Sequence, residues 1–267
     1  MIKINLLVEA RADKVSKAPL ISMGTGNINN YLLLGALILA VTMALFPLLS
    51  RHAGRDEPAL RRTYVMALRW LITLALPIAA LTTFGAEWLV RVLGGSEYLP
   101  HGAIALRIMI WFLPFSFANG LTQYVLIALD RQRWITVSFV IAATFNIVAN
   151  LLVIPRYSYS GAAAVTIASE IVLMVPFLWG LRDLGAPPLL VLAWRPALAT
   201  SLMAISMAAL DSVGAPFAAV VAAGSALFAL ALWPLGAITR EDRALLARLA
   251  HPRVAPADPA VDPDPCG

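Results

Sequence analysis

The sequence has few charged residues for its length. Only 13% of its 267 residues are charged, whereas 60% are hydrophobic, and the mean hydropathy is +0.81. A soluble domain with this composition would lack enough polar side chains to cover its surface. The composition therefore excludes an ordinary soluble domain and predicts a protein that lies in a membrane.

Cysteine and histidine are also scarce. Cys266 is the single cysteine, which excludes a disulfide within the chain. His52, His101 and His251 are far apart and do not have the spacing of metal ligands. No His, Asp, Ser or Cys constellation gathers at one interface, so we expect neither a cofactor nor an enzyme.

Seven apolar segments are long enough to cross a membrane. A hydrocarbon core of about 30 Å needs about 20 mostly apolar residues in a helix. None of the segments alternates between apolar and polar residues, which excludes a transmembrane β-barrel. The sequence therefore predicts an all-α membrane protein with about seven transmembrane helices. The predicted spans are Tyr31–Ser50, Met66–Ala86, Ile108–Leu129, Trp134–Pro155, Tyr157–Leu181, Leu190–Leu210 and Pro216–Ile238.

The arginines follow an alternating pattern between these spans. The gaps after the first, third, fifth and seventh spans, with their flanks, hold 13 arginines, and the opposite gaps hold only Arg91, Arg107 and Arg156. Positive charge in short loops marks the cytoplasmic side of a membrane protein. We therefore predict that the arginine-rich gaps and the carboxyl terminus are cytoplasmic. The overall pI of about 9.7 then indicates anionic lipid headgroups, and not nucleic acid, as partners.

The organisation predicted along the chain has three parts. Residues 1–30 form an atypical amino-terminal segment, residues 31–238 a transmembrane bundle, and residues 239–267 a cytoplasmic tail whose Pro- and Asp-rich end is disordered. Seven spans with a cytoplasmic carboxyl end place the amino terminus outside, yet residues 1–30 carry four basic side chains. We infer that further helices precede Tyr31 in a longer transporter, with an unusual insertion of the amino terminus as the alternative.

Two short amphipathic segments are expected to lie at the membrane surface. Glu87–Leu99 follows the second span and has apolar residues at helical spacing before Gly94 and Gly95. Glu241–Leu249 carries leucines on one side and arginines on the other. Each is predicted to be a separate interfacial helix that serves as an anchor.

Polar side chains occur in the middle of three successive spans. Asn119 and Gln123 lie one turn apart in the third span, Asn146 and Asn150 one turn apart in the fourth, and Glu170 lies in the fifth. Each of these groups lies roughly 16 to 20 Å along its span, near the middle of the membrane. The amides could join helices by hydrogen bonds, or all five residues could line a polar path. An ionisable residue at such depth is a candidate for function.

Several stretches occur in an order that is typical of one transporter family. They are ALFPLLSR at 44–51, AEWLVRVLGGSEYL at 86–99, ALRIMIWFLPF at 105–115, LIALDRQRW at 126–134 and FNIVANLLVIPRYSYSGAAAVTIASE at 145–170. In this succession the chain resembles the polysaccharide-biosynthesis flippases. These belong with multidrug and toxin extruders and lipid II flippases in the multidrug, oligosaccharidyl-lipid and polysaccharide transporter superfamily.

The resemblance implies a fold of two helical bundles around a central cavity, of which this chain would be the second. It implies flipping of an undecaprenyl-diphosphate-linked oligosaccharide across the bacterial inner membrane, with polysaccharide polymerase or glycosyltransferase machinery as further partners. Asn119, Gln123, Asn146, Asn150 and Glu170 would then line the sugar path. The chain departs from its relatives in lacking any positive charge between Lys17 and Arg51. A drug or cation antiporter and a non-transporting remnant or assembly partner remain as alternatives.

Overall fold

A computed structural model describes residues 56–185 and 188–236, all within one compact unit, Leu48–Gly267. The described residues form helices and turns and contain no strand, which confirms the predicted all-α class. The span predicted at Tyr31–Ser50, the helix predicted at Glu241–Leu249 and the two terminal segments lie outside the described residues.

The described helices follow one another with short connections. They are α2 (Glu57–Leu93), η2 (Ser96–Tyr98), α3 (His101–Met109), η3 (Ile110–Phe112), α4 (Leu113–Ala128), α5 (Gln132–Gly180), η4 (Arg182–Leu184), α6 (Leu189–Ser212) and α7 (Phe217–Leu232).

Helix α2 is longer than the span predicted at Met66–Ala86. The Asp56 side chain caps its start by accepting a hydrogen bond of 2.9 Å from the Ala59 N–H. Its 37 residues measure about 55 Å, well over the thickness of a hydrocarbon core. The separate interfacial helix predicted at Glu87–Leu99 is therefore wrong. Glu87 to Leu93 continue α2 without a break, because the first helix-ending residues are Gly94 and Gly95, the latter with φ +101°.

The next apolar stretch begins earlier than the predicted Ile108–Leu129 and is broken in the middle. It runs from His101 to Ala128 as α3, the short turn η3 and α4. Pro114 lies in the first turn of α4, where its missing N–H leaves no helical hydrogen bond unmade. The proline therefore marks the point at which one helix ends and the next begins.

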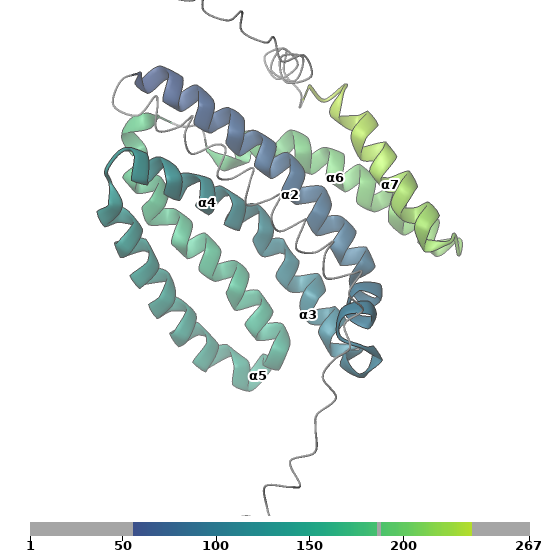
Figure 1. Cartoon of the computed structure of the whole chain (residues 1–267). Coiled ribbons are helices and arrows are strands. Elements are labelled where there is room, and N and C mark those ends of the chain that lie inside the picture. Colours follow the sequence, from purple (N-terminus) through teal and green to yellow (C-terminus); the bar gives the residue numbers. More distant parts are fainter. Residues whose placement is uncertain (1–55, 186–187, 237–267) are drawn as a thin grey trace, which may run out of the picture. The chain divides into compact units, whose positions relative to one another are not determined.

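Helix α5 contains two of the predicted spans, because it folds back on itself. Ser158 has φ +49° and ψ −134°, which are not helical values, and the two arms before and after it run side by side (Figure 1). The Asn146 side chain in the first arm donates a hydrogen bond of 2.8 Å to the Ser169 hydroxyl in the second. The spans predicted at Trp134–Pro155 and Tyr157–Leu181 are thus confirmed as separate segments.

By length and composition, four of the described helical stretches could cross a membrane. They are Glu57–Leu93, His101–Ala128, Gln132–Gly180 and Leu189–Ser212, and the folded α5 supplies two crossings. Helix α7 has only 16 residues, Phe217–Leu232, and is therefore shorter than the span predicted at Pro216–Ile238. Its end is followed by a turn in which Gly236 has φ +61°.

Helix α2 is the central element of the described bundle. It contacts α3 and α4 as well as α6, while α5 packs against α3 and α4, and α7 packs mainly against α6 (Figure 1). Met203 and Met207 of α6 and Val220 of α7 form a buried cluster there. Gly224 lets the two helices approach, since a Cβ at this position would lie 2.5 Å from Cγ of Met207.

Gly224→Ala is expected to lower stability by about 1 kcal/mol, because the flexible Met207 side chain must move aside. The measurement is the melting temperature of the purified protein in detergent. Gly120→Ala is the matched control, because no heavy atom lies within 4 Å of a Cβ built on Gly120. Equal melting temperatures for the two variants would contradict close packing between α6 and α7.

Candidate functional site

A pair of hydrogen bonds in the interior of the described bundle joins α4 to the second arm of α5. Asn119 is only 3% exposed, and its Nδ2 donates one hydrogen bond of 2.7 Å to Oε2 of Glu170 and another of 2.9 Å to the backbone oxygen of Glu170. A hydrogen bond to a carboxylate is stronger than one between neutral groups. Two residues that are 51 positions apart in the chain are thus held together at the middle of their helices.

A second set of contacts continues from this pair into the first arm of α5. Asn146 Nδ2 donates to Ser169 Oγ at 2.8 Å, and Asn150 Nδ2 donates to Asn146 Oδ1 at 3.1 Å. Ser169 in turn donates to the backbone oxygen of Val165 at 2.8 Å. Because Ser169 and Glu170 are neighbours, these contacts form one polar line across α4, the second arm of α5 and the first arm of α5. Its members are Asn119, Glu170, Ser169, Asn146 and Asn150.

The structure therefore brings four of the five predicted residues into this line and leaves one out. Gln123 is half-buried one turn beyond Asn119 and makes no hydrogen bond with the described part of the chain. The side-chain oxygens of Asn119 and Asn150 are buried and also find no donor there. Buried acceptors without a donor are uncommon in folded proteins, so each of these oxygens is able to accept one more hydrogen bond.

The structure also has a buried contact between α2 and α4 that was not among the predicted site residues. The Tyr64 hydroxyl lies 2.9 Å from Thr122 Oγ1, and Thr122 donates to the backbone oxygen of Ala118 at 2.7 Å. Thr122 already uses its hydrogen in that bond, so Tyr64 is the donor to Thr122. The predicted second span began at Met66, which placed Tyr64 outside the membrane and hid its pairing.

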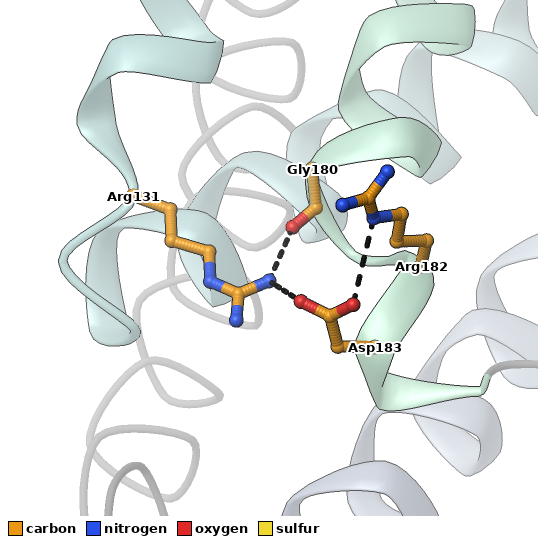
Figure 2. A network of polar contacts seen from close by, with 4 residues as sticks. All are labelled: Arg131, Gly180, Arg182 and Asp183. Atoms are coloured by element: carbon orange, nitrogen blue, oxygen red, sulfur yellow. Dashed lines mark hydrogen bonds and ion pairs between the residues drawn. The ribbon is translucent and has the colours of Figure 1, made fainter.

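The ion pairs among the described residues lie at the ends of helices. Arg107 pairs with Glu87 at 2.8 Å, and Arg131 pairs with Asp183 at 3.1 Å. Arg182 lies 3.5 Å from the same Asp183, so the carboxylate is shared by two arginines (Figure 2). Within the described ranges Glu170 has no such cationic partner. The same ranges contain no group of three His, Cys, Asp or Glu residues close enough to hold a metal ion.

The described helices and their apolar surfaces are those of an all-helical, multi-pass membrane protein. The sequence matches the MatE family over residues 12–152, which is more than half of the chain, and the protein therefore belongs to this family.

The chain also has similarities to two other proteins. The chain is 25% identical over 165 residues to an uncharacterized membrane protein of Methanocaldococcus jannaschii, a match covering 61% of this chain and 31% of that protein. Its fold is similar to that of the lipid II flippase MurJ in an inward closed conformation, with a TM-score of 0.60 and 15% identity. That similarity covers 76% of this chain and 43% of MurJ. The chain thus spans less than half the length of either relative.

Proposed function

We propose that the protein takes part in flipping an undecaprenyl-diphosphate-linked oligosaccharide across the bacterial inner membrane for surface polysaccharide assembly. The single observation that carries the proposal is the polar line from Asn119 through Glu170 and Ser169 to Asn146 and Asn150, within helices that are mostly apolar. Membership in the MatE family and the resemblance to polysaccharide flippases support it.

Sugar hydroxyls can both donate and accept hydrogen bonds, and this line offers both kinds of group. Glu170 and the unsatisfied oxygens of Asn119 and Asn150 accept, while the amide nitrogens of Asn146 and Asn150 each have a second hydrogen to donate. Gln123, one turn from Asn119, would extend the same path. The lipid tail would stay in the bilayer while the glycan moves past these side chains. The protein would act as a transporter and not as an enzyme, together with polysaccharide polymerase or glycosyltransferase machinery.

The test is glycan export in a bacterial strain that lacks its own flippase and expresses this protein from its complete gene. Glu170→Gln keeps the size of the side chain and removes its charge, and we expect export to fall by roughly tenfold or more. Thr144→Val is the matched control, because Thr144 is exposed and bonds only to Val140 of its own helix at 2.8 Å. Normal export by the Gln variant would remove Glu170 from the mechanism.

A second candidate function is drug or cation antiport. It is favoured by the Glu170 carboxylate, which has no cationic partner within the described part of the chain and could exchange a proton or sodium ion. The two functions are distinguished in the same strain by measuring glycan export and drug resistance together. Resistance without export would favour antiport, and neither activity would favour a non-transporting partner.

A further inference from the structure

The contact between Glu170 and Asn119 depends on how the second arm of α5 lies along α4. This arm is joined to α3 and α4 at three levels. Near Ser158, the Tyr159 hydroxyl lies 2.9 Å from His101 Nδ1 of α3. In the middle, Glu170 meets Asn119. At the far end, the Arg131 guanidinium donates to the Gly180 backbone oxygen at 2.7 Å and pairs with Asp183 (Figure 2).

The two end contacts lie at similar distances from Glu170. Glu170 is 11 residues after Tyr159 and 10 residues before Gly180, which correspond to about 16 and 15 Å of helix. The end contacts therefore lie near the edges of the membrane, outside the polar line itself. They can fix the position of the arm without taking part in binding a cargo.

The packing surface of the arm changes along its length. Its buried residues are small near Ser158 and larger toward its far end, where Arg131 binds: Gly161, Ala163 and Val165, then Leu173 and Phe177, before the final Gly180. Inside a membrane, helices gain little from the hydrophobic effect on association, so polar contacts and close packing decide their register. A shift by one residue would move Glu170 about 1.5 Å and turn it by about 100°, away from Asn119.

Arg131 is well placed to prevent such a shift. It lies in the turn directly after α4, the helix that carries Asn119. Both of its partners follow Glu170 along the chain, Gly180 as the last residue of α5 and Asp183 in η4. The last carbonyls of a helix have no partner within the helix, so a guanidinium that binds Gly180 caps α5 as well. Trp134 and Leu126 also lie close to Gly180, where a Cβ would come within 2.8 and 3.0 Å of them.

We propose that Arg131, through Gly180 and Asp183, is a positioning residue that sets the register of the second arm of α5 and so holds Glu170 against Asn119. This inference rests on the proposed function for its biological meaning, but the register itself can be measured without transport. The same geometry gives the His101 and Tyr159 pair the corresponding role at the opposite end of the arm.

The test is oxidative cross-linking between cysteines at positions 119 and 170 in a Cys266→Ser background. Asn119→Cys and Glu170→Cys remove the middle contact, so the end contacts alone hold the register. We expect Arg131→Gln to slow disulfide formation roughly tenfold, as for the loss of a charge-assisted hydrogen bond. Arg131→Lys, which keeps a charged donor, is expected to restore most of the rate.

Arg133→Gln is the matched control. It removes the same charge two residues further along, where the exposed Arg133 side chain makes no hydrogen bond or ion pair with the described part of the chain. Should Arg131→Gln fail to accumulate, Asp183→Asn weakens the same link and takes its place. An unchanged cross-linking rate in both Arg131→Gln and Asp183→Asn would overturn the proposal.

A transport measurement then separates this inference from the proposed function. If Arg131 acts through Glu170, Arg131→Gln lowers export in the otherwise native protein but has no further effect in a Glu170→Gln background. Additive losses would overturn the positioning role. A slower cross-link with unchanged export would support the role of Arg131 in register and contradict the proposed function of Glu170.

Discussion

Replacing Gly161 with leucine is expected to prevent the two arms of α5 from closing. A Cβ at this position would lie 2.6 Å from Cγ1 of Val153 and 2.9 Å from Cβ of Tyr157, and the Val153 backbone oxygen would be 3.3 Å away. Because the position of the Tyr157 Cβ is set by the backbone, the clash is not relieved by a change of side-chain conformation. We expect a loss of stability of at least about 3 kcal/mol, at the upper end of the range for overpacking.

The loss would extend to the polar line, because the arms must separate and the contact between Asn146 and Ser169 would break. The measurement is the fraction of protein that elutes as a single folded species from size-exclusion chromatography in detergent. Gly120→Leu provides the control, since the same side chain added in α4 meets open space. If both variants elute as the wild type does, the two arms of α5 do not need a glycine at position 161 to pack together.

The sequence was sufficient to predict the fold class and most of the crossings. Long apolar runs identify helices in a membrane because every backbone polar group must be satisfied within the helix. The bend in α5 at Ser158 lies next to the gap predicted between the spans Trp134–Pro155 and Tyr157–Leu181. The ends of α2 were not predicted. Hydropathy records where lipid contact stops, whereas the helix continues into water until a cap or a glycine pair ends it.

Only part of the candidate site was predicted, because local patterns do not show which helices meet. Spacing of four residues shows that Asn146 and Asn150 share a face, but it does not show which neighbouring helix that face meets. Asn119 and Gln123 share a face by the same rule, yet only Asn119 contacts Glu170. That choice depends on the rotation and register of two helices, which are set by contacts such as Arg131 with Gly180. No local pattern contains this information.

Asn119→Asp is expected to have the largest effect of any single change in the polar line. The new carboxylate would replace an amide that lies 2.7 Å from Oε2 of Glu170, in a position that is 3% exposed. Two like charges about 4 Å apart repel by about 4 kcal/mol at an effective dielectric constant near 20. The expected result is a corresponding fall in stability, measured by thermal unfolding in detergent, and a loss of glycan export.

A second substitution is expected to reverse part of the fall in stability. In Asn119→Asp with Glu170→Gln, one amide and one carboxylate face each other again with their positions exchanged, so the amide at 170 can donate to the carboxylate at 119. Gln123→Glu is the matched control for adding a carboxylate to α4, because Gln123 makes no hydrogen bond to Glu170 and its variant gains nothing from Glu170→Gln. Full recovery is not expected, because a carboxylate at 119 cannot donate to the Glu170 backbone oxygen as the Asn119 amide does at 2.9 Å. No recovery at all would contradict a direct contact between the two side chains. Regained stability without regained export would place the requirement on a carboxylate at position 170 itself, as expected if that residue contacts the cargo.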